Sequence, residues 1–176
     1  MPKKFDQISS DLIRKNPYWE YVLDRYVLPN GEEADYHFVR TEGSTMVIPR
    51  YGEEFIMVRQ YRYLNKRFSI EFPGGGIKPG NSSELNAREE LLEESGFRAE
   101  HIKKIGEFNP FNGVTSEICE VFLAEDLSFV GQETEASEEI EVIRLTSDSI
   151  NEKIKEGEIW DGMTIASWCQ YQSMEK

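Results

Sequence analysis

The sequence predicts an α/β (α+β) protein that begins with an antiparallel β extension. Two kinds of segment support this fold class. Runs of apolar, aromatic and β-branched residues with the length of strands recur along the chain, bounded by turn residues. Three segments near 82–96, 147–157 and 163–174 instead have the caps or the apolar spacing typical of helices. A chain of 176 residues is long enough for one domain with a real core and a small extension.

Composition argues against several classes of function. The formal net charge of −13 argues against binding of nucleic acid through its phosphates, which requires a basic surface. No apolar run is long enough to span a bilayer, and the N-terminus has no signal-peptide pattern. Cys119 and Cys169 are far apart and form no CxxC motif, so neither a zinc site nor a disulfide framework is indicated. We therefore expect a cytoplasmic protein with no membrane or nucleic-acid partner.

The N-terminal region has two parts. Residues 1–16 are polar and predict a frayed or short helical lead-in. Residues 18–28 and 34–40 indicate two strands of a hairpin, because both are rich in aromatic and β-branched residues and a Pro-Asn-Gly turn separates them. The aromatic side chains either pack within the hairpin or form a surface for dimerisation and base stacking.

Two further strands are expected at 45–49 and 54–63, around a turn at 50–53. The second strand ends in a Gln-Tyr-Arg sequence. It is followed by the segment 71–80, in which a strand leads into a loop of three glycines. Consecutive glycines allow the backbone to approach a ligand or a metal ion closely.

A helix follows the glycine loop. Asn81 and Glu84 have the spacing of a capping box, with Ser82 and Ser83 as competing N-caps, and Gly96 suits the left-handed position after the last turn. At about 100° per residue, one face of this helix is apolar and the opposite face is acidic. The apolar face contains Leu85, Leu91, Leu92 and Ser95, and the acidic face contains Glu89, Glu90, Glu93 and Glu94.

The acidic face has two interpretations. Like charges three and four residues apart repel one another in an isolated helix, so the face is either a solvated surface or a binding site for a cation. Clusters of carboxylate oxygens bind hard divalent ions such as Mg²⁺, and such ions can activate a bound water. The glycine loop in front of the helix and the leucines behind it favour the metal site.

This segment resembles the box of Nudix hydrolases, G-x5-E-x7-R-E-U-x-E-E-x-G-U, in which U is a bulky apolar residue. Two positions depart from the pattern, because its first Glu is Asn81 here and its Arg is Glu89. In the family these two residues support the box, so their joint replacement indicates altered support around an intact set of metal ligands. The matching residues are Gly75, Glu90, Leu91, Glu93, Glu94, Gly96 and Phe97.

The resemblance implies a Nudix-type α/β/α sandwich with a mixed β-sheet at 43–176, after an extension at 1–42. It also implies Mg²⁺ as the cofactor, with Mn²⁺ as the alternative ion. The family's metal ligands, carried onto this sequence, are Glu90, Glu93, Glu94 and the carbonyl of Gly74. The three glutamates are thereby also candidate catalytic residues.

Two segments resemble the branch of the family that hydrolyses ADP-ribose and other nucleoside-diphosphate sugars. Arg62 corresponds to an arginine that contacts substrate, and Arg59 is a second candidate on the same strand. A loop at 109–117 loosely matches a Pro-x-x-Gly-x-x-x-Glu pattern, so Gly113 and Glu117 become candidate sugar contacts. Without the resemblance, Arg62 is equally a surface residue and Glu117 a solvated loop acid.

The acidic segment 131–139 indicates a mobile surface loop by composition. The resemblance adds that a catalytic glutamate lies just before the following strand. Glu138 is the first candidate and Glu135 the second. The other elements expected after the acidic helix are strands at 102–108, 118–124 and 140–145, a capped helix at 147–156 that ends at Gly157, and a last helix at 163–174.

The resemblance implies Mg²⁺-dependent hydrolysis of the pyrophosphate bond in a nucleoside diphosphate linked to a sugar. The leading substrate is ADP-ribose, which would give AMP and ribose 5-phosphate. A homodimer is also implied, since similar ADP-ribose pyrophosphatases dimerise through an N-terminal sheet. Two alternatives stay open: a Nudix pyrophosphatase for dinucleotides or nucleoside triphosphates, and a catalytically weakened Nudix-fold module that only binds nucleotides.

Overall fold

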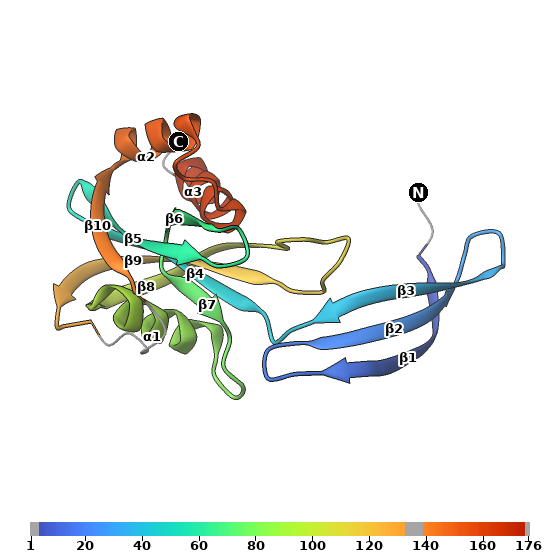
Figure 1. Ribbon diagram of the computed structural model, residues 1–176. Coiled ribbons are helices and arrows are strands. Elements are labelled where there is room, and N and C mark those ends of the chain that lie inside the picture. The colour runs from blue at the N-terminus through green and yellow to red at the C-terminus, as the bar shows by residue number, and fades with distance from the viewer. Residues whose placement is uncertain (1–3, 133–138, 175–176) are drawn as a thin grey trace.

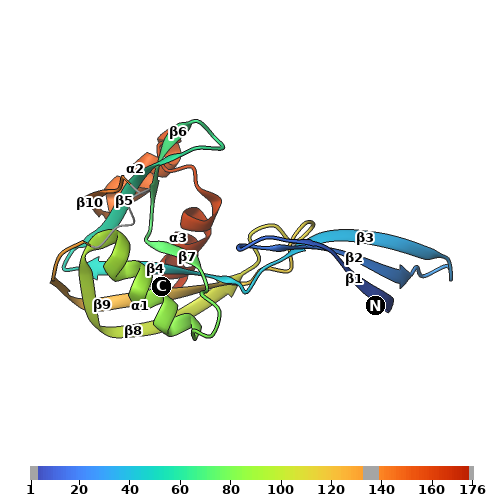
Figure 2. The same cartoon turned by 60° about the horizontal axis from the view of Figure 1, so that its bottom comes forward.

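Two β-sheets form the framework of the molecule in a computed structural model that describes residues 4–132 and 139–174. The smaller sheet is antiparallel and has the strand order β1-β2-β3. It projects from one side of the larger body and is called here the N-terminal arm (Figure 1, Figure 2). Its strands are β1 (Asp6–Lys15), β2 (Glu20–Val27) and β3 (Glu33–Arg40).

The larger sheet has seven strands in the described part of the chain and forms the centre of the body. Its main path runs β10-β5-β4-β9-β8, while β6 pairs with β5 and β7 with β4. The β4–β9 pair is parallel and the other pairs are antiparallel, so the sheet is mixed, as predicted. Its strands are β4 (Ser44–Tyr51), β5 (Glu54–Arg62), β6 (Arg67–Glu71), β7 (Gly74–Gly76), β8 (Phe97–Phe108), β9 (Cys119–Phe129) and β10 (Glu141–Thr146).

Helices cover both faces of this sheet, which confirms the predicted α/β/α sandwich (Figure 1). Successive residues of a strand point to opposite faces. Ile48 of β4 accordingly lies in the core cluster that includes residues of α2 and α3, whereas Val47 lies in the cluster that includes residues of α1. In β5 the same alternation separates Met57 from Ile56. The helices are α1 (Ser83–Ser95), α2 (Ser147–Glu156) and α3 (Gly162–Met174).

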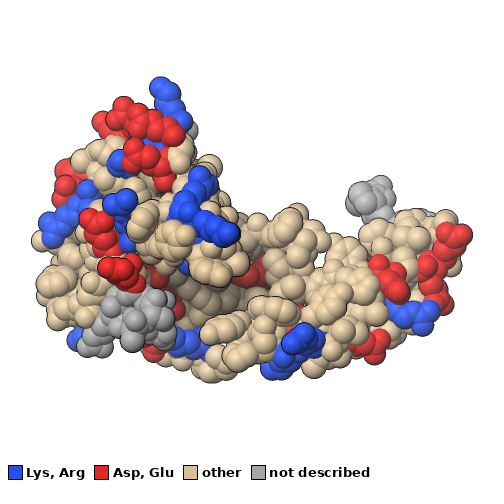
Figure 3. All heavy atoms as spheres, in the orientation of Figure 1, with Lys and Arg blue, Asp and Glu red and all other residues tan. Residues whose placement is uncertain are grey.

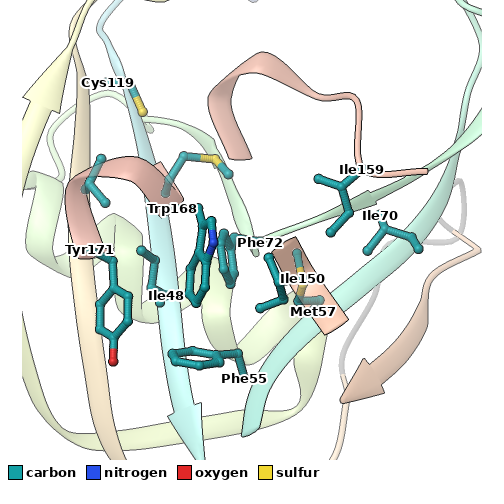
Figure 4. Close-up of a cluster of buried hydrophobic side chains, with 12 residues drawn as sticks. Ile48, Phe55, Met57, Ile70, Phe72, Cys119, Ile150, Ile159, Trp168 and Tyr171 are labelled. Atoms are coloured by element: carbon teal, nitrogen blue, oxygen red, sulfur yellow. The ribbon is translucent and has the colours of Figure 1, made fainter. Parts of the chain in front are cut away.

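The core beneath α2 and α3 is built around aromatic rings (Figure 4). Trp168 and Tyr171 of α3 stack with ring centroids 5.2 Å apart, and Phe55 meets them edge-on at 5.0 and 5.2 Å. Phe72 lies against Trp168, and its backbone N–H donates to the Thr164 hydroxyl at 3.2 Å. Since Phe72 comes directly before the Pro-Gly-Gly-Gly segment, the core fixes the chain at the point where the candidate site begins.

The first strand corrects one sequence prediction. The frayed or short helical lead-in expected at 1–16 is wrong over its described part, because β1 pairs with β2 from Asp6 to Lys15. Nearly all side chains of β1 are exposed, so the strand has no buried face that would give it a strand-like pattern. Backbone pairing with β2 determines its conformation. The hairpin expected after it is confirmed as β2 and β3.

The arm is joined to the body by the loop between β8 and β9. The Val39 backbone N–H donates to the Val114 carbonyl at 2.8 Å, and the Val39 carbonyl accepts from the Ser116 N–H at 3.1 Å. The Tyr36 hydroxyl donates to the Gly113 carbonyl at 3.1 Å. These hydrogen bonds hold β3 against a segment that lies more than seventy residues later in the chain.

Two features of the acidic helix and its approach differ from prediction. The three glycines form the short strand β7 paired with β4, where a loop was expected. In α1, Leu85 is 46% exposed, whereas Asn86 is fully buried. Asn86 reaches into the body because its amide donates to the Thr45 hydroxyl at 3.1 Å, so a polar contact replaces the expected leucine contact on this face.

The other predicted helices and strands are confirmed, and β8 and β9 are longer than expected. Gly96 has the left-handed conformation predicted at the end of α1, with φ 74°, and Phe97 behind it is buried. The predicted bounds of α2 are those of the structure. In the described ranges, no helix combines the length and the apolar character needed to cross a membrane.

Candidate active site

At Gly74 and Gly75, the strand β7 approaches β4 and α1 at distances that leave little room for a side chain. A Cβ atom on Gly74 would clash with the Thr45 carbonyl oxygen, and a Cβ atom on Gly75 would lie 2.7 Å from Oε2 of Glu90. At Gly74 only a bare backbone fits, because the obstacle is the backbone of β4, whereas at Gly75 the obstacle is the carboxylate end of the Glu90 side chain. The Gly74 carbonyl, a predicted metal ligand, therefore lies on a strand that directly faces the acidic helix.

The three predicted carboxylate ligands face the segment 74–78. Glu94 is only 6% exposed, and its Oε2 accepts a hydrogen bond from the Gly74 backbone N–H at 3.0 Å. Glu90 lies against Gly75. Glu93 accepts from the ammonium group of Lys78, with N–O distances of 2.9 and 3.1 Å. The strand and the turn after it thus contact each predicted ligand in a different way.

The donor chemistry of these residues suits a hard divalent ion. Glu90, Glu93 and Glu94 are three and four residues apart and offer only oxygen atoms, which Mg²⁺ and Mn²⁺ prefer. Within residues 4–132 and 139–174, no three His, Cys, Asp or Glu side chains are gathered as a group that could hold a metal ion. The three glutamates, with the Gly74 carbonyl, are the oxygen donors that the strand β7 and the helix α1 bring to the same place.

The two residues that depart from the box pattern contact one another. The Asn81 amide donates to Oε2 of Glu89 at 3.0 Å. Lys78 lies beside this pair, with Nζ 3.6 Å from Oε2 of Glu89. Its hydrogen bond with Glu93 raises the pKa of Lys78 above the ordinary lysine value. No sequence pattern indicates a role for Lys78. The one hint in the sequence is that the arginine of the box pattern is replaced by Glu89, which leaves the acidic face without that positive charge.

A cavity of about 530 Å³ lies beside β7. This volume falls in the range of pockets that bind small organic ligands. Its walls come from the turn before β2, the β3–β4 connection, the ends of β5 and β6, the glycine strand and the start of α3. The polar side chains in its walls include Arg62, Glu71, Lys78, Glu117 and Asp161.

Arg62 is fixed in this cavity by Glu71, which the sequence interpretation did not single out. The Arg62 Nε donates to Oε1 of Glu71 at 2.8 Å, and its Nη2 donates to Oε2. These hydrogen bonds raise the pKa of Arg62, although partial burial lowers it. Glu71 is buried, so the pair places a guanidinium of set orientation in the cavity wall. The one feature of the sequence that could have indicated Glu71 as a site residue is its position directly before Phe72 and the glycines.

Glu117, a predicted sugar contact, also lines the cavity. Its Oε1 accepts a hydrogen bond from the Ser44 hydroxyl at 2.5 Å. Asp161 enters from the start of α3, where its carboxylate accepts from the Thr164 backbone N–H at 2.7 Å and so caps the helix. Neither Ser44 nor Asp161 was predicted from the sequence as a site residue.

The remaining predicted site residues lie elsewhere. Gly113 belongs to the loop that contacts the arm and is not part of the cavity wall. Arg59 faces a separate hollow near β10, where it pairs with Glu141 at 3.4 Å. Glu135 and Glu138 lie outside the described residues.

Residues 39–164 match the NUDIX domain, and the chain belongs to this family. It is a Nudix hydrolase, in agreement with the acidic helix, the glycine strand and the sandwich fold.

The ADP-ribose pyrophosphatase of Bacillus subtilis (strain 168) is 34% identical over 150 residues, which cover 81% of each chain. The methanol dehydrogenase activator of Bacillus methanolicus is 29% identical over 181 residues, covering 100% of this chain and 97% of that protein. Among solved structures, the crystal structure of an ADP compounds hydrolase is similar to this chain, with a TM-score of 0.85 and 18% sequence identity. The similarity covers 98% of this chain and 94% of the hydrolase chain. That last similarity concerns the fold.

Proposed function

We propose that this protein hydrolyses the pyrophosphate bond of a nucleoside diphosphate linked to a sugar, with Mg²⁺ as the cofactor. ADP-ribose is the leading substrate, and AMP and ribose 5-phosphate are its products. The observation that carries the proposal is that a single cavity is lined both by Arg62 and by the strand that faces the acidic helix. The similarity to the pyrophosphatase of B. subtilis supports the choice of substrate.

In this proposal, different residues of the cavity bind different parts of the substrate. Arg62 binds the diphosphate, because Glu71 holds two of its nitrogen atoms and so orients a guanidinium in the cavity wall. Glu117 and Ser44 form a hydrogen-bonding pair that suits a ribose hydroxyl. Asp161 supplies a further acceptor in the wall.

The acidic helix supplies the metal site of this proposal. Glu90, Glu93, Glu94 and the Gly74 carbonyl would hold Mg²⁺, with Mn²⁺ as the alternative. A bound divalent ion neutralises charge on the pyrophosphate oxygens and lowers the pKa of the attacking water. The water's proton passes to a general base, for which Glu138 is the first candidate and Glu135 the second.

The same proposal includes a homodimer formed through the N-terminal arm. Its exposed apolar side chains are numerous for a surface in water, and the space-filling view shows a mostly uncharged surface along the arm between its charged tip and the body (Figure 3). Tyr18, which is 84% exposed, stands where the arm meets the cavity. The exposed apolar residues of the arm include Phe5, Ile8, Leu12, Ile13, Tyr18, Trp19 and Tyr36.

The first experiment is product analysis with ADP-ribose and a panel of ADP- and GDP-sugars, with and without Mg²⁺. We expect AMP and ribose 5-phosphate only with Mg²⁺, and loss of both products in Glu94→Gln, which keeps the size of the side chain but removes its charge. Glu84→Gln is the matched control, because Glu84 lies on the same helix but pairs with Arg88 at 3.1 Å.

Other outcomes would favour the alternatives. Turnover of dinucleotides or nucleoside triphosphates, with none of the sugars, would indicate a Nudix pyrophosphatase of different specificity. Ligand binding without any Mg²⁺-dependent product across the panel would overturn the proposal and indicate a nucleotide-binding module.

A further inference from the structure

The acidic helix lacks the cation that the box pattern places on it. The pattern has a glutamate and an arginine at the two positions where this chain has Asn81 and Glu89. The two still meet, with the Asn81 amide donating to Glu89 at 3.0 Å. Asn81 and Glu89 are thus in contact, but together they carry one negative charge. The glutamate and the arginine of the pattern together carry no net charge. A positive charge that offsets Glu89 beside the metal-binding glutamates must therefore come from another residue.

Arg88 is the nearest arginine in sequence, but it does not take this role. One residue along a helix is a rotation of about 100°. Arg88 accordingly points to another side, where its guanidinium donates to the Ala99 carbonyl at 3.0 Å and pairs with Glu84.

Lys78 places a positive charge beside Glu89 and Glu93. Its Nζ lies 2.9 and 3.1 Å from the two carboxylate oxygens of Glu93 and 3.6 Å from Glu89. Its backbone is also anchored, because the Lys78 N–H donates to the side-chain oxygen of Asn86 at 3.0 Å. Asn86 is fully buried and donates in turn to Thr45 of β4 at 3.1 Å. The ammonium therefore extends from a backbone position that is tied to the central sheet.

We propose that Lys78 is the positioning residue of this metal site and replaces the arginine of the box pattern, acting from the turn after β7 instead of from the helix. This inference rests on the metal-binding role proposed above for Glu90, Glu93 and Glu94. Glu89 and Glu93 are four residues apart and repel one another. Lys78 lies between them, offsets the repulsion and holds Glu93 toward the glycine strand.

The test measures Mn²⁺ binding to the substrate-free protein by electron paramagnetic resonance, which needs no turnover. Lys78→Met should weaken Mn²⁺ binding roughly 10- to 100-fold, the scale expected when the support of a metal ligand is removed. Lys78→Arg should retain most of the affinity, because it keeps the charge. Lys104→Met is the matched control, since Lys104 also bridges two carboxylates, Glu107 and Glu120, at 2.7 and 3.0 Å, but lies outside the cavity.

A rescue experiment separates this role from a general effect on folding. The double change Asn81→Glu with Glu89→Arg rebuilds the pair of the box pattern. In that background Lys78→Met should cost much less Mn²⁺ affinity than in the wild-type background. An equal loss in both backgrounds, or an unchanged or tighter Mn²⁺ affinity in Lys78→Met alone, would overturn the proposal.

The outcomes also distinguish this inference from the proposed function. If Mn²⁺ binding depends on Lys78 but no nucleotide sugar is hydrolysed, the proposed function fails and the role of Lys78 stands. If ADP-ribose is hydrolysed while Lys78→Met binds Mn²⁺ as the wild type does, only the role of Lys78 fails. Absence of Mn²⁺ binding in the wild-type protein would overturn the role of Lys78, whereas the proposed function is decided by product formation.

Discussion

Gly75 and Gly76 are neighbours in β7, yet their surroundings differ. A Cβ atom on Gly75 would lie 2.7 to 2.8 Å from the carboxylate of Glu90, whereas a Cβ atom on Gly76 would meet nothing within 4 Å. The obstacle at Gly75 is the far end of a flexible side chain, which can turn away at little cost to the fold. A side chain at position 75 would therefore disturb the position of the Glu90 carboxylate more than it would lower the free energy of unfolding.

We expect Gly75→Ala to displace the Glu90 carboxylate and to lower kcat/KM for ADP-ribose roughly 100-fold, the scale of a displacement of about 1 Å in a catalytic group. The free energy of unfolding in urea should change by less than about 1 kcal/mol. Gly76→Ala is the control and should change neither quantity. Similar activities of the two variants would contradict the close approach of Gly75 and Glu90.

The two cysteines provide a test that depends on pH. Burial raises the pKa of the Cys119 thiol from its ordinary 9.0 to about 12, while Cys169 is exposed. Below pH 9 the Cys119 thiol is protonated in the folded and unfolded states and adds no pH dependence. Between pH 9 and about 12 the unfolded chain releases a proton that the folded protein keeps, so the stability falls by about 1.4 kcal/mol per pH unit from this group.

Cys119→Ala should therefore show a shallower loss of unfolding free energy between pH 8 and pH 10 than the wild type. The measurement is urea unfolding at both pH values. Cys169→Ala serves as the control and should keep the wild-type slope. A parallel loss in Cys119→Ala and the wild type would show that the thiol is not buried.

At the scale of elements, α1 and α2 end in the same way but in different surroundings. Gly96 and Gly157 both have left-handed backbones, with φ of 74° and 77°. A Cβ atom on Gly96 would lie 2.8 Å from the Gln132 backbone nitrogen and from the Phe129 ring, whereas one on Gly157 would meet nothing within 4 Å.

Gly157→Ala should lower the free energy of unfolding by about 1 kcal/mol, the cost of a left-handed alanine. Gly96→Ala should lose that amount and a further 1–3 kcal/mol or so, because the added methyl group overpacks its neighbours. Urea unfolding of both variants measures the difference. Equal losses would mean that the backbone at 131–132 can move away freely.

The elements also show what could be predicted from the sequence. The bounds of α2 were predictable because its caps are local: the Thr146 hydroxyl accepts from the Ser149 N–H, and Gly157 ends the helix. The common face of Glu90 and Glu94 on α1 likewise follows from helical periodicity alone. By contrast, β1 was not predictable, since only its pairing with β2 makes it a strand.

Contacts between segments far apart in the sequence account for the part of the site that was not predicted. Glu117 meets Ser44 across seventy-three residues, and no spacing within either segment indicates this pair. Lys78 and Glu93 are on different elements, so their contact depends on how β7 packs against α1. A single sequence indicates which residues share a helix face, but it does not indicate which loop will meet that face.

On the scale of the whole molecule, the N-terminal arm has a large surface and little core of its own. The arm contacts the body through the loop between β8 and β9, and most of β1 is exposed. A three-stranded sheet with exposed apolar side chains is a natural surface for a second copy of the chain.

We expect the double change Ile8→Glu with Leu12→Glu on β1 to convert a dimer to a monomer in sedimentation equilibrium, because charged side chains are costly to bury in an apolar interface. Met174→Glu is the control, since Met174 is similarly exposed at the end of α3. A wild-type protein that is monomeric at all concentrations would contradict the proposed dimer.

The aromatic core beneath α2 and α3 also affects the order in which a newly synthesised chain can fold. The cluster beneath α1 has all its buried members between residues 47 and 124, so it can close while the ribosome is still adding the C-terminal part. Trp168 and Tyr171, which cover Phe55, emerge after that cluster is complete. Until they emerge, one face of the sheet stays uncovered, and the growing chain is most prone to aggregation in this interval.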